Sequence, residues 1–227
     1  MELEIGQLIE FVFRWIHFFA GVAWIGLLYY FNFVQGEYFK EADAAAKSSA
    51  ISKLVPRALW WFRYGALFTF LSGLALAGFL GQTINYYIVV GMLLGTLMFL
   101  NVWLVIWPNQ QIVIASTNQV IGGGAALPEA AGAAAKAGLA SRTNTLFSLP
   151  MLFFMGASAH LGGNGSLPMT LVEESVSTLA IALSLVIIAG LEFNALRGKQ
   201  GPMTTVKGVI HSGVGLLVVL LVVIQYL

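Results

Sequence analysis

The stretch YYIVVGMLLGTLMFLNVWLVIW, residues Tyr86–Trp107, contains no charged side chain. A helix needs about 20 mostly apolar residues to cross the hydrocarbon of a bilayer, because its backbone groups find no partners in lipid except one another. This stretch therefore predicts a transmembrane helix. Five other segments meet or approach that length, which predicts an all-α integral membrane helical bundle of about six transmembrane helices. They lie near Phe11–Val34, Leu59–Leu80, Thr145–Leu161, Val172–Ala195 and Val206–Tyr226.

The composition supports this class. Of 227 residues, 59% are apolar and 9% are charged, with a mean hydropathy of +0.85; a soluble domain carries about a quarter of its residues as charges. We expect residues 1–227 to form a single membrane domain. The net charge is +1 and the basic residues are scattered, which gives no reason to expect nucleic acid. The chain has no cysteine, which excludes disulfides, iron–sulfur clusters, thiolate metal sites and covalently attached c-type haem.

The basic residues fall in alternate connections between the expected spans. Under the positive-inside rule these connections are cytoplasmic, so both termini face the outside, which in a bacterium is the periplasm. We expect a multi-pass protein of the bacterial inner (cytoplasmic) membrane. The acidic Glu2, Glu4 and Glu10 and the length of the first span indicate a retained helix rather than a secretory signal. The basic residues are Lys40, Lys47, Lys53 and Arg57, then Lys136 and Arg142, then Arg197, Lys199 and Lys207.

Residues 108–144 form the long polar connection in the second half of the chain, and we expect a cytoplasmic loop that contains a short helix. The Ala-rich part begins at Pro128, a residue favoured in the first turn of a helix. Several amides near this side could line a polar pocket, but satisfying broken helix ends is the favoured interpretation. These amides are Asn32, Asn101, Gln110, Gln111 and Asn144.

Ionisable residues inside a bilayer are functional candidates, since each costs about 2.5–3.5 kcal/mol to insert. In the first span, Arg14, His17, Gly21 and Trp24 recur at spacings of three and four, which places them on one helix face. A histidine with a glycine one turn away suits a b-type haem, because imidazole binds iron and the glycine leaves room for the macrocycle. Arg14 could pair with a haem propionate. The alternative is a buried histidine hydrogen-bonded to a neighbouring helix.

The second axial ligand is open between His211, which has glycines nearby, and His160 at the outer end of the fourth span. For His211 the alternative is helix packing through small residues. For His160 the alternative is a histidine at the membrane interface without a ligand. Arg57 and Arg63 are interpreted as snorkelling at the cytoplasmic edge. For Glu192, an ion pair with Arg197 is favoured over proton transfer.

Four blocks of sequence carry a resemblance to a known family. Together they resemble the membrane domain of the bacterial cytochrome-c-linked urate oxidase family, also called urate hydroxylase, in order from about residue 8 to residue 161. The first block alone also resembles membrane protoporphyrinogen oxidases and copper-resistance membrane proteins. The blocks are WIHFFAGVAWIGLLYYFNFVQ (Trp15–Gln35), PRALWWFRYGALFTFLSG (Pro56–Gly73), WLVIWPNQQ (Trp103–Gln111) and ASRTNTLFSLPMLFFMGASAH (Ala140–His160).

The resemblance implies oxidation of urate to 5-hydroxyisourate, with electrons passed down a chain. The family's C-terminal cytochrome c domain is expected to be lacking here, so electrons would leave through a separate c-type cytochrome or respiratory complex. Arg142, Thr143 and Asn144, inside the fourth block and at the expected start of the fourth span, are expected either to contact substrate or to structure that helix start. The alternative is a non-catalytic haem-carrying or structural subunit of a larger electron-transfer complex. A transporter finds little support, because the spans show no evident repeat.

Overall fold

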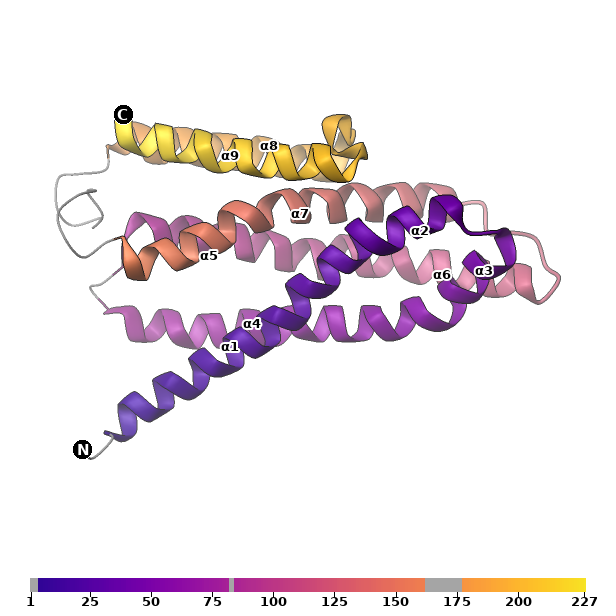
Figure 1. Cartoon of the computed structure of the whole chain (residues 1–227), viewed down its shortest axis with the longest axis horizontal. Helices are drawn as coiled ribbons and strands as arrows, with labels where there is room; N and C mark the ends of the chain where they lie inside the picture. The colour runs from indigo at the N-terminus through magenta and orange to yellow at the C-terminus, as the bar shows by residue number, and fades with distance from the viewer. Residues whose placement is uncertain (1–3, 82–83, 162–176) are drawn as a thin grey trace.

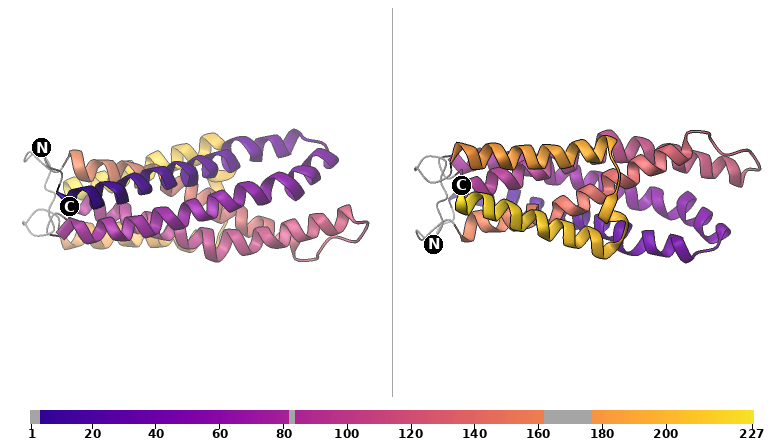
Figure 2. Two further views of the ribbon diagram at one scale, coloured as in Figure 1. Left: turned by 90° about the horizontal axis from the view of Figure 1, so that it is seen from below. Right: turned by 90° about the horizontal axis from the view of Figure 1, so that it is seen from above.

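The computed structural model describes residues 4–81, 84–161 and 177–227, and these are helical almost throughout (Figures 1 and 2). Three long helices are interrupted by wider π-helical segments without a break in the chain direction. The elements are α1 (Ile5–Tyr29), η1 (Tyr30–Gln35) and α2 (Gly36–Glu41); α3 (Ala44–Ser49), η2 (Ala50–Leu54) and α4 (Val55–Leu80); α5 (Tyr86–Leu100), η4 (Asn101–Ile106) and α6 (Trp107–Ile121); α7 (Ala130–His160); α8 (Thr178–Arg197); the 3₁₀ turn η5 (Gly201–Thr204); and α9 (Val206–Tyr226).

The expected all-α membrane bundle is confirmed. Within the described residues, five continuous helices are long and apolar enough to cross a membrane: Ile5–Glu41, Ala44–Leu80, Tyr86–Ile121, Thr178–Arg197 and Val206–Tyr226. The helix α7 is the sixth long helix and runs along the bundle between the others (Figure 1). The start of α1 and the end of α9 lie at the same end of the bundle (Figure 2). This is the arrangement expected when the chain crosses an even number of times.

The expected boundaries differ from the observed ones around residues 108–144. Instead of one loop with a short helix, α6 continues the third span as far as Ile121, and α7 begins at Ala130. Pro108 lies directly after the π-helical segment η4, inside the continuous helix Tyr86–Ile121, and does not end it. Polar residues therefore continue helices beyond the apolar core. The expected start of the fifth span, Val172, lies outside the described residues; α8 begins at Thr178, capped by Ser177.

Pro150 lies inside α7, which continues through it. A proline has no N–H, so the carbonyl of Leu146, four residues earlier, loses its helical partner. Gly213 of α9 packs against this carbonyl, and a Cβ atom at that glycine would lie 2.8 Å from the Leu146 oxygen. The expected close approach near Gly213 is therefore a contact between helices α7 and α9.

Helices α1 and α4 also pack at close backbone distance. A Cβ atom at Gly65 would lie 3.1 Å from the backbone nitrogen of Trp24 and 3.2 Å from the carbonyl oxygen of Ala20. Glycine at this position lets the two helix axes approach, as small residues do in membrane bundles.

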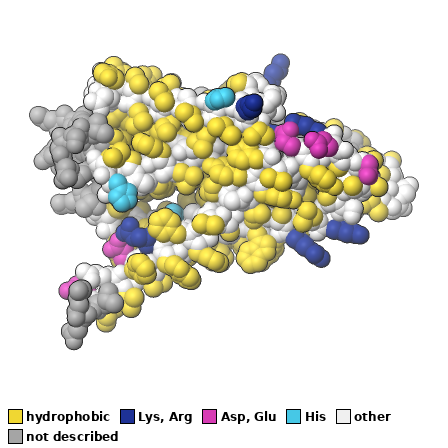
Figure 3. All heavy atoms as spheres, viewed as in Figure 1, with side chains coloured by type: hydrophobic (Ala, Val, Ile, Leu, Met, Phe, Trp, Pro, Cys, Tyr) yellow, Lys and Arg dark blue, Asp and Glu magenta, His cyan; other side chains and the backbone are white. Residues whose placement is uncertain are grey.

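The two ends of the bundle differ. Helices α8 and α9 stop well short of the end formed by α2, α3 and α6 (Figure 1). Hydrophobic side chains cover much of the middle of the face shown in Figure 3, and charged side chains lie mainly towards that projecting end. The projecting end is therefore the more polar part of this face.

Candidate functional site

A run of polar residues in the middle of α7 is buried inside the bundle. Arg142 is 8% exposed and Asn144 is 0% exposed, and Thr143, Thr145 and Ser148 are also buried. Side chains from the first long helix and from η4 hydrogen-bond to this run, and Glu192 of α8 bonds to Asn101 of η4. We call the whole group the polar centre; it comprises Ser141, Arg142, Thr143, Asn144, Thr145 and Ser148 with Tyr29, Asn32, Gln35, Asn101 and Glu192.

Asn144 and Asn101 form the middle of the polar centre. The Nδ2 group of Asn101 donates to Oδ1 of Asn144 over 3.0 Å and to Oε2 of Glu192 over 3.0 Å. The Nδ2 group of Asn144 donates to the carbonyl oxygen of Met98 over 2.9 Å. Three helical segments, η4, α7 and α8, are thereby joined by side-chain hydrogen bonds. Because Glu192 bonds to Asn101, the expected ion pair with Arg197 is wrong.

On the other side of α7, the first helix contributes two hydrogen bonds. The Nδ2 group of Asn32 donates to Oγ of Ser141 over 2.8 Å, and the hydroxyls of Tyr29 and Ser148 lie 2.9 Å apart. Asn32 also donates to the carbonyl oxygen of Leu28 over 2.9 Å, just before the π-helical segment η1. Asn32 and Asn144 therefore bond both to backbone carbonyls beside π-helical segments and to side chains across helices, whereas Asn101 bonds to side chains. The interpretation that the amides satisfy helix backbone groups thus holds for Asn32 and Asn144 in part and not for Asn101.

The two asparagines that contact α7 both lie in π-helical segments, Asn32 in η1 and Asn101 at the start of η4. A π-helix adds a residue to a turn and so rotates the side chains that follow, and such segments occur frequently at functional sites. No hydrophobic periodicity marks this local change, so sequence reasoning placed these residues in spans without predicting their direction.

Two polar atoms of the polar centre are buried and have no hydrogen-bond partner among the described residues: Nη1 of Arg142 and Oε1 of Gln35. Gln35 and Arg142 are close in the fold. Gly36 follows Gln35 in the chain, and a Cβ atom built on Gly36 would lie 4.0 Å from Nη2 of Arg142. Glu37 is close enough to act electrostatically on Arg142. A buried donor and a buried acceptor cost stability unless a water or a ligand pairs with them, so these two atoms are candidates for ligand contact.

Of the residues expected around a haem, His17 is half-buried against α4. Its Nδ1 lies 2.9 Å from the carbonyl oxygen of Thr69 and 3.3 Å from Oγ of Ser72. A Cβ atom at Gly73 would lie 3.1 Å from the His17 ring, so this glycine makes room for the imidazole. The Nε2 atom makes no hydrogen bond to any described residue. This bond to the Thr69 carbonyl on α4 is the alternative stated for His17, a histidine hydrogen-bonded to a neighbouring helix. A carbonyl at Nδ1 with Nε2 free is also typical of a metal-binding histidine, so Nε2 is the atom that would hold iron.

The other expected haem contacts are more dispersed. Arg14 is exposed and forms an ion pair with Glu10. A Cβ atom at Gly21 would lie 3.9 Å from the Thr69 side chain, so Gly21 faces α4 rather than open space. Trp24 is buried, and its indole N–H has no partner among the described residues.

The two candidates for the second axial ligand are exposed, His160 at the end of α7 and His211 on α9. Helices α1 and α9 lie on opposite sides of the bundle (Figures 1 and 2). Within the described residues, no group of three or more histidine, aspartate or glutamate side chains is placed to hold a metal ion. Haem ligation by His17, with either partner, stays a prediction.

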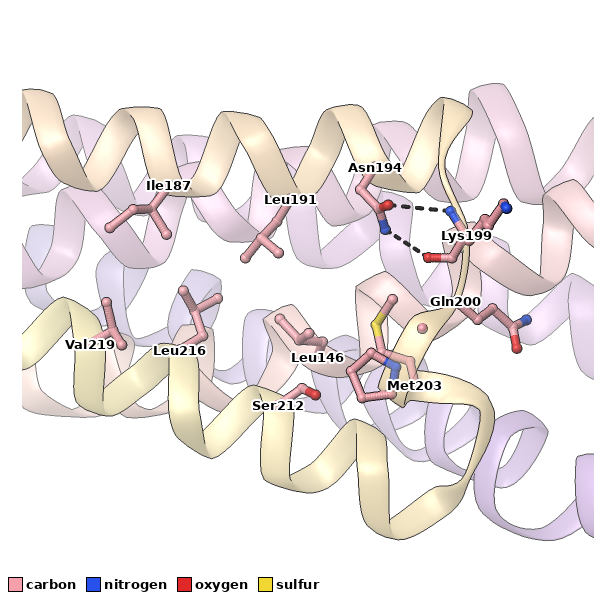
Figure 4. A pocket seen from close by; sticks show the side chains of 12 residues that line it. Leu146, Ile187, Leu191, Asn194, Lys199, Gln200, Met203, Ser212, Leu216 and Val219 are labelled. Carbon is pink, nitrogen blue, oxygen red and sulfur yellow. Dashed lines mark hydrogen bonds between the residues drawn. The ribbon is translucent and has the colours of Figure 1, made fainter.

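A separate hollow of about 520 Å³ lies between α8, α9 and the turn that joins them. Figure 4 shows mainly apolar side chains along it, including Ile187, Leu191 and Leu216, which come from facing helices. At its mouth the Asn194 side chain bonds to the backbone N–H and carbonyl of Lys199, over 3.3 and 3.1 Å. The Asn194 amide thereby stabilises the turn, and Lys199, Gln200 and Ser212 also line the hollow.

The fold and the polar centre together define a polytopic helical membrane protein with a hydrogen-bonding centre buried inside its bundle. The particular family follows from comparison with known proteins. The chain belongs to the urate oxidase N-terminal family, whose model matches residues 79–224. No curated protein and no solved structure matches the chain. The matched segment contains Asn101, Arg142, Asn144 and Glu192, whereas His17 and Gln35 lie before it.

Proposed function

We propose that this chain is a membrane-embedded, urate oxidase-like redox protein that binds urate or a related small heterocycle at the polar centre. Electrons would pass to a c-type cytochrome or a respiratory complex, in an inner (cytoplasmic) membrane. Membership of the urate oxidase N-terminal family supports the relationship. The residues expected to contact substrate, Arg142, Thr143 and Asn144, are all buried polar residues of the bundle.

The observation that carries this proposal is the unpaired combination of Arg142 Nη1 and Gln35 Oε1. Urate and related purine derivatives present carbonyl acceptors beside ring N–H donors and carry negative charge near neutral pH. The Arg142 guanidinium would donate to a carbonyl or anionic oxygen, and the Gln35 carbonyl would accept from a ring N–H. Such a site discriminates strongly, because a wrong ligand leaves buried polar groups unpaired.

The proposed oxidation converts the heterocycle and one water into the hydroxylated product, two electrons and two protons. A haem bound at His17 Nε2 would supply a one-electron carrier. The protein itself would orient the ring through Arg142 and Gln35 and exclude bulk water with the surrounding helices. Glu192, hydrogen-bonded to Asn101 at the edge of the polar centre, is a carboxylate available to accept a proton.

The test is urate-dependent reduction of a purified c-type cytochrome by the full chain in detergent or nanodiscs. Arg142→Gln is expected to lower kcat/KM by about 10- to 100-fold, since a hydrogen bond to a charged group contributes about 1.5–3 kcal/mol. Gln35→Leu is expected to lower it as well. Lys136→Gln, which removes an exposed charge from the same helix, is the matched control.

Equal activity of Arg142→Gln and Lys136→Gln would exclude Arg142 from substrate binding. Tight urate binding without any reduction of cytochrome would contradict the enzymatic part of the proposal and favour a non-catalytic subunit.

A further inference from the structure

Arg63, on α4, lies among aromatic rings and away from any acidic partner. Its guanidinium carbon is 3.7 Å from the centre of the Trp107 ring, 5.3 Å from that of Trp103 and 5.1 Å from that of Tyr64. The ion pairs between described residues are Arg14 with Glu10 and Lys40 with Glu37, so Arg63 has no carboxylate partner in the part of the chain that the structure covers. The aromatic faces stabilise the cation but accept only weakly from its N–H groups.

Two N–H donors in this cluster remain unpaired. The Nε group of Arg63 and the indole Nε1 group of Trp103 are both buried, and neither has a hydrogen-bond partner among the described residues. They come from different elements, α4 and η4. Both are donors without acceptor capacity, so a ligand that satisfies them must supply acceptor oxygens. The positive charge favours an anion.

The turns of α4 that precede Arg63 line a surface hollow. It has a volume of about 390 Å³ and is lined by Pro56, Arg57, Trp60 and Trp61. Trp60 and Trp61 are 47% and 59% exposed. The Trp60 ring lies 4.7 Å from the Tyr64 ring, which itself contacts the Trp103 ring at 6.1 Å. An aromatic surface thus connects the open hollow to the buried donors.

The surroundings indicate which anion fits. Large apolar side chains farther along α4, Phe68, Leu71 and Leu74, are exposed on a helix long and apolar enough to cross a membrane. An occupant of the hollow therefore has its apolar part beside lipid-facing residues and its charged part beside Arg57. Tryptophan at such positions is typical of the headgroup level of a bilayer. Arginine binds phosphate oxygens through several N–H groups at once.

We propose that Arg57, Arg63, Trp60, Trp61 and Trp103 form a binding site for the phosphate headgroup of an anionic phospholipid. The phosphate oxygens accept from the arginines and from Trp103 Nε1, and the acyl chains lie along the exposed apolar face of α4. This site is distinct from the polar centre: η4 directs Asn101 towards α7 and Trp103 towards α4.

The experiment measures lipid binding to the purified full chain by native mass spectrometry and by tryptophan quenching with brominated lipids. Phosphatidylglycerol is the test lipid, phosphatidylcholine is the zwitterionic comparison, and inorganic phosphate is the soluble competitor. We expect the protein to bind phosphatidylglycerol more tightly than phosphatidylcholine. Arg63→Gln should weaken the affinity for phosphatidylglycerol about tenfold, because the positive charge and the paired N–H donors of the guanidinium are lost together. Arg63→Lys keeps the positive charge but lacks the paired N–H donors of a guanidinium, so its affinity should be intermediate.

Trp103→Phe keeps an aromatic ring but removes the N–H group together with part of the ring system, so its fold is checked by circular dichroism beside its lipid binding. We expect it to weaken phosphatidylglycerol binding several-fold, at an unchanged helical circular dichroism spectrum. Lys136→Gln, which removes an exposed charge from α7, is the control for nonspecific charge and should bind as the unchanged chain does.

Wild-type binding by both Arg63→Gln and Trp103→Phe would overturn the proposal. Equal binding of phosphatidylglycerol and phosphatidylcholine would overturn the preference for an anion. Complete displacement of the lipid by millimolar inorganic phosphate would identify free phosphate, rather than a lipid, as the ligand.

Discussion

Replacing Gly65 by alanine tests the close contact between α1 and α4. The new Cβ atom would lie 3.1 Å from the Trp24 nitrogen, 3.2 Å from the Ala20 oxygen and 3.4 Å from the Trp24 Cα atom. All three are backbone atoms, which cannot move aside by a rotamer change, so the two helices must separate by a few tenths of an ångström. Overpacking of this kind costs about 1–3 kcal/mol.

Gly78→Ala is the matched control, because Gly78 lies on the same helix and a Cβ atom there meets nothing within 4 Å. Both variants gain the same helix-forming advantage of alanine over glycine. The difference between their free energies of unfolding therefore isolates the contact with α1, and we expect about 1–3 kcal/mol in favour of Gly78→Ala. Equilibrium unfolding in mixed micelles with increasing sodium dodecyl sulfate, followed by circular dichroism, measures both values. Equal stability of the two variants would refute the close packing of α1 on α4.

Two further predictions concern the interior. A double-mutant cycle of Asn101→Ala and Asn144→Ala should give a coupling energy of about 0.6–1.7 kcal/mol, the range for hydrogen bonds between membrane helices; additive effects would contradict the bond between these amides. If a b-type haem is bound, the purified chain shows a Soret band that shifts on reduction with dithionite, and His17→Leu abolishes it. Comparing His160→Leu with His211→Leu then identifies the second ligand by which variant changes the spectrum, and a chain with no Soret band would exclude the haem.

The helical membrane fold could be predicted because apolar runs such as Tyr86–Trp107 follow directly from the solvent that they require. Helix ends were harder to predict. Polar residues in 108–121 do not end a helix when their own side chains can bond to it, as Asn109 does to the Val105 carbonyl and Thr117 to that of Val113. The length and hydropathy of the apolar runs therefore located the membrane spans but underestimated the lengths of the helices that contain them.

The candidate site was predicted in part. Arg142 and Asn144 were expected to contact substrate from the resemblance of their block, and the structure places both in the buried polar centre. Gln35 was missed, because a single amide near the end of a span forms no recognisable sequence pattern. Its importance depends on Arg142, which is distant in the sequence and close in the fold. The role expected for Glu192 was wrong for the same reason: Arg197 is its neighbour along the chain, whereas Asn101 is its partner across the bundle.

The three longest continuous helices extend well beyond the thickness of a bilayer. The three continuous helices Ile5–Glu41, Ala44–Leu80 and Tyr86–Ile121 have 36 or 37 residues, which at 1.5 Å per residue is about 55 Å. The bilayer hydrocarbon accounts for only about 30 Å of that length. In a nanodisc imaged by electron microscopy, these three helices should therefore project from one side of the bilayer as a helical stalk. Such a stalk would serve as an alignment marker for a small membrane protein, and an antibody fragment bound to residues 122–129 at its tip would report directly which leaflet it occupies.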